Sequence, residues 1–221
     1  MTLPDTKSRE PKQARSRQSF EKAVEAALAL LEERGNDEFT LAEVSAHAGV
    51  SIGSIYARFQ GKDELIRVAH GRKMDDIDAV SDHLFEALRL DPRAPLKSYA
   101  QEAVNLTIEI LRRYADILRP FMLRATQDET ISKRGAASHA VMAAHFADVL
   151  RAWPGGYLGQ PDIDWSFNVA YSVVARRLGL GSTTEGSGDV EWPDIAEKLA
   201  GMVASYLLAE LDGSNRKSRG H

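Results

Sequence analysis

The chain has 221 residues, of which 43% are apolar, and this is enough for the packed core of one large domain or two modest ones. It contains no apolar run long enough to span a membrane, and its polar, charged N-terminus has no secretory signal, so we expect a cytoplasmic protein. The absence of cysteine excludes disulfides, thiolate nucleophiles and cysteine-ligated zinc.

The net charge of −4 is unevenly distributed along the chain. Residues 1–62 carry equal numbers of basic and acidic side chains, so the negative excess lies in the remainder. Within residues 7–20, Glu10 is the only acidic residue among several lysines and arginines. We predict that residues 1–13, which include two prolines, form a disordered basic arm that can follow a DNA backbone or minor groove.

An amphipathic helix is predicted over residues 14–34. Its apolar residues recur at helical spacing, and Gly35 ends the pattern before a turn at Asn36 and Asp37. The residues of this apolar stripe are Phe20, Val24, Ala27, Leu28 and Leu31.

Two short helices joined by a glycine turn are predicted next, over residues 41–48 and 52–59. Thr40 precedes the first of them, with Glu43 three positions further on, and this spacing predicts a capping box. Gly49 follows the first helix and is suited to the left-handed conformation past a helix end. Two short helices with such a turn are typical of a helix-turn-helix.

The second short helix has two different sides. Ile55 and Phe59 are four residues apart and are expected to face inward. The opposite stripe of Ser51, Ser54 and Arg58 is small and polar, which allows close approach to a duplex, and a helix of this size fits the major groove. The alternative, an ordinary solvated face, is disfavoured by the preceding glycine turn.

Lys62 falls at the start of the next predicted helix. A cation at this position interacts unfavourably with the positive end of the helix dipole. A phosphate beside Lys62 would explain the lysine, because the phosphate is favoured both by the cation and by the helix N-terminus. A plain surface lysine is the alternative.

The run FTLAEVSAHAGVSIGSIYARFQGKDELI resembles the DNA-binding signature of the TetR family of transcriptional regulators. The shared pattern is a threonine-capped helix, an Ala-Gly-Val-Ser turn and a Gly-Ser-Ile-Tyr recognition helix, followed by Phe, Lys and Leu at fixed offsets. The resemblance covers about residues 14–66. It implies an all-α fold in which a three-helix DNA-binding head on residues 14–62 precedes an effector-binding and dimerisation domain on residues 63–213.

The resemblance also implies which residues contact DNA. Four of them hold phosphates in the family, namely Thr40, Ser54, Tyr56 and Lys62, and another four lie at or near base edges, namely Ile52, Gly53, Ala57 and Arg58. Ile52 departs from the polar residue often found there, so it either touches a thymine methyl or folds back onto the core. The full predicted set is Arg15, Arg17, Thr40, Ser51, Ile52, Gly53, Ser54, Tyr56, Ala57, Arg58 and Lys62.

The rest of the chain is predicted to be helical. No segment shows sustained two-residue alternation with β-branched enrichment. Helices are expected over about residues 63–90, 96–114, 128–153, 162–178 and 193–211, with a shorter segment, divided by Pro120, that ends near residue 126. Residues 214–221 are expected to form a disordered basic tail.

The last two predicted helices each carry an apolar stripe. In the TetR family this helix pair meets its copy across a two-fold axis, and reading a palindrome requires two heads one helical turn apart. The alternative is that both stripes are ordinary core within one chain. The predicted homodimer residues are Phe167, Tyr171, Val174, Leu199, Met202 and Tyr206.

A small-molecule effector in the larger domain is implied by the resemblance, and we expect it to be apolar or amphipathic. The candidate residues are Phe121, Met122, Arg124, His139, Met142, His145 and Phe146. Methionine and aromatic residues at this spacing are equally consistent with plain core, and Arg124 can instead pair with Asp128. His139 and His145 do not share a helical face, so neither a metal site nor a cofactor is expected.

No motif of a common enzyme class is present, since the chain lacks a nucleophile elbow, a P-loop and a His-Glu-x-x-His sequence. The sequence therefore predicts a DNA-binding transcriptional regulator. By default this is a repressor that binds a palindromic operator as a homodimer and is released by a small molecule. The alternative is a helical protein that binds a ligand or a partner without specific DNA binding.

Overall fold

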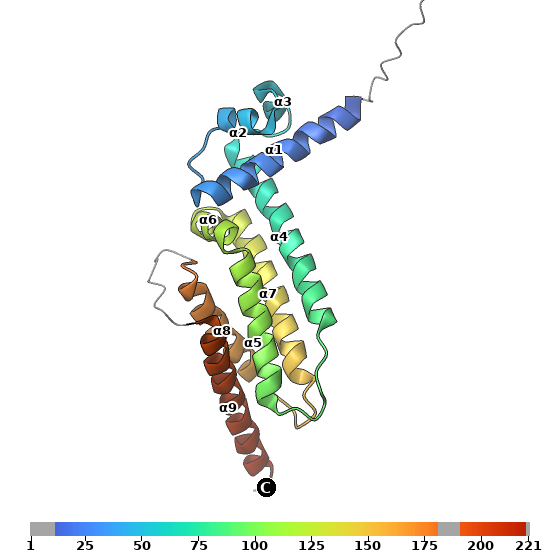
Figure 1. Ribbon diagram of the computed structural model, residues 1–221, viewed down its shortest axis with the longest axis vertical. Coiled ribbons are helices and arrows are strands. Elements are labelled where there is room, and N and C mark those ends of the chain that lie inside the picture. The colour runs from blue at the N-terminus through green and yellow to red at the C-terminus, as the bar shows by residue number, and fades with distance from the viewer. Residues whose placement is uncertain (1–11, 181–190, 220–221) are drawn as a thin grey trace, which may run out of the picture. The chain divides into compact units, whose positions relative to one another are not determined.

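The computed structural model describes residues 12–180 and 191–219, and it describes the side-chain surroundings of residues 14–180 and 191–213. Every regular element in these ranges is an α-helix, which confirms the predicted all-α class (Figure 1). The chain divides into two compact units, Met1–Arg72 and Lys73–His221. Helix α4 (Lys62–Ala87) contributes to both units.

The first unit is a small helical head. It contains α1 (Lys12–Arg34), α2 (Leu41–Ala48), α3 (Ile52–Tyr56) and the beginning of α4. The rings of Phe20 and Phe59 stack 5.2 Å apart, and Arg72 of α4 forms an ion pair with Glu21 of α1. The buried residues that hold the head together are Val24, Ala27, Leu31, Phe39, Val44, Ile55, Phe59, Leu65 and Ile66.

The turn between α2 and α3 follows from local hydrogen bonding. Gly49 has φ 63° and ψ 32°, the left-handed conformation that glycine adopts without steric cost. The amides of Gly49 and Val50 both bond to the carbonyl of Ser45, and the Ser45 hydroxyl donates to the Val50 carbonyl at 2.6 Å. These bonds satisfy groups that a helix end would otherwise leave unpaired, so the chain turns sharply into α3.

Helix α3 is shorter than predicted. The amides of Arg58 and Phe59 both donate to the carbonyl of Ile55, each at 2.9 Å. The chain therefore tightens immediately after Tyr56 instead of continuing as a regular α-helix to Phe59.

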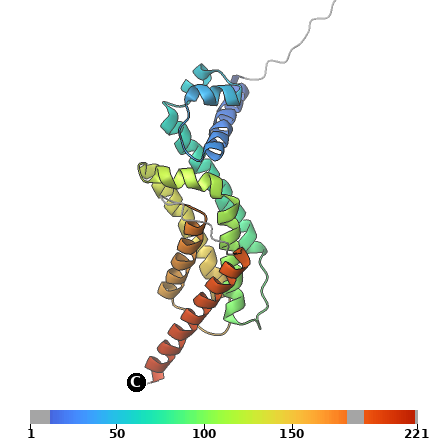
Figure 2. The same ribbon diagram turned by 60° about the vertical axis from the view of Figure 1, so that its left-hand side comes forward.

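The second unit is built around α5 (Leu96–Arg113). This helix packs against α7 (Glu129–Arg151), α8 (Gln160–Arg177) and α9 (Trp192–Arg219), and α9 lies along it in both views (Figures 1 and 2). The short α6 (Ala115–Ala125) packs on α7. Large side chains fill the core between these helices, among them Tyr99, Ile110, Leu111, Phe121, Phe146, Phe167, Val174 and Leu207.

Two features of this unit differ from the sequence prediction. Pro120 lies inside α6 and does not divide it, because the carbonyl that it leaves without a helical partner is that of Asp116, in the first turn of the helix. Helix α9 runs on to Arg219, whereas a disordered tail was predicted from residue 214. The remaining residues of the tail, and residues 1–11 of the predicted arm, lie outside the described part of the chain.

Candidate nucleic-acid interface

The N-terminus of α2 is held by the predicted capping box. The Thr40 hydroxyl accepts a hydrogen bond from the Glu43 amide at 3.2 Å, and the Thr40 amide donates to the Glu43 carboxylate at 2.8 Å. Arg34 donates to the other oxygen of that carboxylate at 2.6 Å. The hydrogen bond from Arg34, together with those from Thr40, lowers the pKa of Glu43 to about 2. The cap therefore keeps its charge and its geometry at neutral pH.

Helix α3 is anchored on one side only. Ser51 caps it by accepting from the Ser54 amide at 3.2 Å, and the two serine hydroxyls lie 2.8 Å apart and share a hydrogen bond. Ile55 is buried in the head. Because the anchoring is internal, the outer side of α3 remains exposed.

The predicted DNA-contacting residues of α3 lie on this exposed outer side. Tyr56 is 58% exposed and Ile52 is 42% exposed, so Ile52 does not fold back onto the core. Ser54 is half-buried beside them. Four further members of the predicted set in or next to α3 are exposed, namely Ser51, Gly53, Ala57 and Arg58.

Lys62 is more than a plain surface lysine. Its ammonium donates to the carbonyl of Asp37 at 2.7 Å and lies 5.5 Å from the centre of the Phe39 ring. This contact ties the start of α4 to the turn between α1 and α2. An ammonium group has three donors, so the bond to Asp37 leaves it able to bind a phosphate as well.

Arg15 and Arg17 are exposed near the start of α1. No hydrogen bond or ion pair of their side chains with another described residue is found, and the structure does not connect them to α3. Both guanidinium groups therefore lie near the start of α1, where a polyanion such as DNA can reach them.

Taken together, the head presents hydroxyl, phenol, guanidinium and ammonium groups around a short exposed helix. These are the side chains that bind phosphates and base edges in protein–DNA interfaces. Residues 23–69 match the family described as bacterial regulatory proteins, tetR family. This part of the chain is similar to the DNA-binding domain of TetR-family regulators. The match associates this head with DNA binding in transcription regulation.

Solved structures of transcriptional regulators share the fold. SCO7518 of Streptomyces coelicolor A3(2), which its name describes as a transcriptional regulator, has a TM-score of 0.61 at 18% identity, over 85% of this chain and 98% of that one. A TetR-family regulator of Streptomyces coelicolor has a TM-score of 0.62 at 16% identity, over 86% and 83% of the two chains. The fatty acid degradation regulator FadR of Bacillus halodurans has a TM-score of 0.59 at 13% identity, over 90% and 97%. No curated protein matches the chain.

The residues predicted to form a TetR-like dimer interface are divided between core and surface. Phe167, Val174 and Leu199 are buried within the single chain, and Tyr171 and Tyr206 are half-buried. Burial raises the pKa of the Tyr171 hydroxyl. Met202 is 44% exposed. Sequence analysis missed the other exposed apolar side chains of α8 and α9, Trp165, Val173 and Leu208, because they lie beside the predicted stripes rather than on them.

The predicted effector residues are also dispersed. Phe121, Met142 and Phe146 are buried, and His139 packs against the rings of Phe167 and Tyr171. Burial lowers the pKa of His139, which favours its neutral form. Arg124 lies 4.0 Å from Asp128, the pairing that the sequence offered as an alternative.

Hollows of ligand size are found among the described residues of the second unit. One, of about 990 Å³, lies between α5 and α9 and is lined by Arg112, Arg113 and Trp192 among others. Another, of about 430 Å³, lies where α4 and α7 end, and His145 is on its wall. The other six predicted effector residues are on the wall of neither of these hollows. None of the described helices is apolar over a length that would cross a bilayer.

Proposed function

We propose that the protein is a repressor that occupies a palindromic operator as a homodimer and leaves it when a small apolar or amphipathic molecule binds the larger domain. The observation that carries the proposal is the exposed outer side of α3, which is fixed from inside by Ile55 and joined to α2 by the Gly49 turn. A short helix held in this way can enter a major groove without deforming the head.

We assign phosphate contacts to residues around this helix. Thr40, Ser54 and Tyr56 supply neutral hydroxyl donors, and Lys62 supplies a cation. Arg15 and Arg17 are placed to follow the backbone or the minor groove. Such contacts fix the register of a protein on DNA and provide most of its salt-dependent affinity.

We assign base contacts to the outer face of α3. Arg58 can bond the two acceptors of a guanine, and Ile52 and Ala57 suit the methyl group of thymine. Gly53 allows close approach because it has no side chain. A Cβ added there would lie 4.0 Å from the Ser51 hydroxyl, so the head itself has room for one.

Dimerisation is assigned to the exposed apolar side chains of α8 and α9. Trp165, Val173, Met202 and Leu208 are large apolar groups on neighbouring helices, and clusters of exposed apolar residues mark interaction surfaces. The buried Phe167, Val174 and Leu199 support this surface from within. A two-fold contact here would match the symmetry of a palindrome.

The test is selection of bound duplexes from a random pool by the purified protein at two salt concentrations, followed by sequencing. We expect a palindromic motif and an affinity that falls steeply with salt, because each phosphate contact releases counterions. If no motif emerges and binding is weak even at low salt, the proposal fails. The helical ligand-binding alternative then takes its place.

A further inference from the structure

The side chain of Arg34, the last residue of α1, reaches across the loop between α1 and α2. Its Nη1 donates to the backbone carbonyl of Glu38 at 2.6 Å, and its Nη2 donates to the carboxylate of Glu43 at 2.6 Å. The side chain of Arg34 is 33% exposed and that of Glu43 is 43% exposed. This ion pair therefore lies at the surface of the head, beside the start of α2.

The other carboxylate oxygen of Glu43 is bonded to Thr40. It accepts from the Thr40 amide at 2.8 Å and from the Thr40 hydroxyl at 2.9 Å. A threonine hydroxyl has a single proton to donate. The hydroxyl that we assign to a DNA phosphate is thus already bonded to a carboxylate of the head, and Thr40 must release Glu43 before it can donate to DNA.

The charge of Glu43 also acts on DNA. Its pKa is lowered to about 2 by the hydrogen bond from Arg34 and by those from Thr40, so the carboxylate is ionised at neutral pH. An ionised carboxylate bonded to Thr40 repels a phosphate that approaches the same hydroxyl. The guanidinium of Arg34 cancels most of this repulsion, because it binds the carboxylate directly. It also keeps Glu43 in place when the hydroxyl turns away.

Lys62 also bonds to this loop, at the carbonyl of Asp37, but the two cations differ. The ammonium of Lys62 donates to a neutral carbonyl and keeps its full charge for a phosphate. The guanidinium of Arg34 is paired with a carboxylate, and an ion pair has no net charge. Direct attraction of a phosphate therefore belongs to Lys62 and not to Arg34.

We propose that Arg34 is a positioning residue for DNA binding. It neutralises and holds Glu43, so that the Thr40 hydroxyl can turn from Glu43 to a phosphate of the operator. Arg34 stays bonded to the protein and does not itself contact DNA. This inference rests on the proposed function, because it concerns how the head engages the operator.

The test is titration of the selected operator with the full-length protein and three variants, namely Arg34→Gln, Glu43→Gln and the double variant. Arg34→Gln should weaken binding about tenfold for a dimer, because it leaves an unpaired carboxylate beside each phosphate. Glu43→Gln alone should bind at least as tightly as the wild type, since a glutamine at this position of a capping box still caps the helix. The double variant should recover to within about twofold of the wild type, because no charge remains to repel the phosphate. A double variant as weak as Arg34→Gln would overturn the proposal.

A matched control removes a different carboxylate from the same loop. Glu38 is exposed, and its backbone carbonyl rather than its carboxylate accepts from Arg34. Arg34→Gln combined with Glu38→Gln should therefore stay about tenfold weaker than the wild type. Equal recovery in both double variants would show a general effect of net charge and refute the role of Glu43.

The double variant with Glu43→Gln also separates positioning from direct contact. It has the net charge of the wild type, so its slope of log affinity against log salt should be unchanged. If Arg34 itself bound a phosphate, the slope would fall by about 0.9 per head and affinity would not recover. That result would overturn the proposal.

A merely structural role is tested by amide exchange of α2 in the same variants. Arg34→Gln and the double variant both lose the ion pair, so both should lose protection of α2 to a similar extent. Recovery of operator affinity without recovery of protection is the expected result. If affinity followed protection in every variant, Arg34 would only stabilise the head and the proposal would fail.

The part played by the Thr40 hydroxyl is tested in Thr40→Val. Without the hydroxyl, Arg34→Gln should cost about threefold in operator affinity or less, instead of tenfold. Losses that simply multiply would refute the link between Arg34 and Thr40. If the wild type selects no operator, the proposed function itself fails. If it selects one and Glu43→Gln does not rescue Arg34→Gln, the inference fails while the function stands.

Discussion

The Tyr56 hydroxyl provides a direct test of the DNA interface. Tyr56 is 58% exposed and its hydroxyl bonds to no described residue, so Tyr56→Phe should change the free energy of unfolding by less than about 0.5 kcal/mol. A hydrogen bond to a charged phosphate contributes about 1.5 kcal/mol or more. With two heads on one operator the loss is about 3 kcal/mol, which is about a hundredfold in affinity.

The measurement is a titration of the selected duplex at several salt concentrations. The slope of log affinity against log salt should stay that of the wild type, because the substitution removes no charge. Tyr157→Phe is the matched control, since Tyr157 is also exposed but lies in the second unit. Unchanged operator affinity in Tyr56→Phe, or an equal loss in Tyr157→Phe, would refute the assignment of Tyr56 to a phosphate.

Three further predictions address charge, pH and assembly. Lys62→Met should reduce the slope of log affinity against log salt by about 0.9 per head, because one phosphate contact is lost. It should also destabilise the head by about 1 kcal/mol, because the hydrogen bond from Lys62 to a backbone carbonyl is lost. An unchanged slope would show that the lysine is only structural. The lowered pKa of Glu43 implies a stabilisation that is complete above pH 4.5 and is lost as the pH falls toward 2. The difference in stability between the wild type and Glu43→Gln should therefore shrink over that range when it is followed by amide exchange of α2. A constant difference would contradict this prediction. The double variant Met202→Asp and Leu208→Asp should sediment as a monomer, because it places charges on the exposed apolar surface of α8 and α9. The control Leu123→Asp, at an exposed apolar position of α6, should remain a dimer. Dimers in the double variant would exclude the surface of α8 and α9 as the dimer interface.

The sequence predicted the head in detail because its signals are local. Thr40 and Glu43 are three residues apart, and Gly49 follows the last helical residue of α2, so hydrogen bonds between near neighbours decide both features. The same locality explains the error at α3. Whether Arg58 and Phe59 continue the helix depends on how the chain enters α4, and no spacing of apolar residues encodes that.

The apolar stripes of the later helices indicated that α8 and α9 are amphipathic, but not which side faces the body. Phe167, Val174 and Leu199 proved to be core, and the exposed Trp165 and Met202 lie beside them. A stripe identifies the apolar side of a helix, while the packing of other helices against it decides how much of that side stays exposed.

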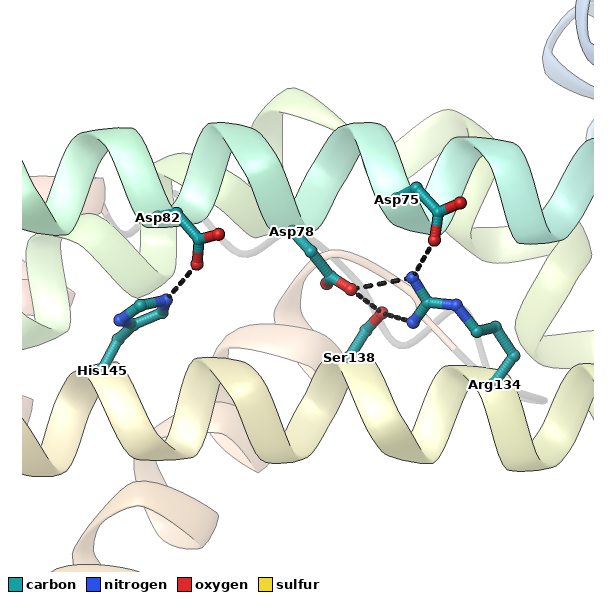
Figure 3. A network of polar contacts seen from close by, with 6 residues as sticks. All are labelled: Asp75, Asp78, Asp82, Arg134, Ser138 and His145. Carbon is teal, nitrogen blue, oxygen red and sulfur yellow. Dashed lines mark hydrogen bonds and ion pairs between the residues drawn. The ribbon is translucent and has the colours of Figure 1, made fainter.

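What only the tertiary structure decided is the contact between α4 and α7, a row of polar contacts in which three aspartates of α4 point toward α7 (Figure 3). The partners in that row are 56 to 63 positions apart in the chain, so no local pattern connects Asp82 to His145 or Asp78 to Arg134. The hollow beside His145 likewise takes its wall from the ends of two helices and from α5. The sequence by itself determined an all-α chain with a TetR-like head, because caps, turns and helical periodicity are set by neighbouring residues. The position of an effector site depends on side chains that only folding brings together.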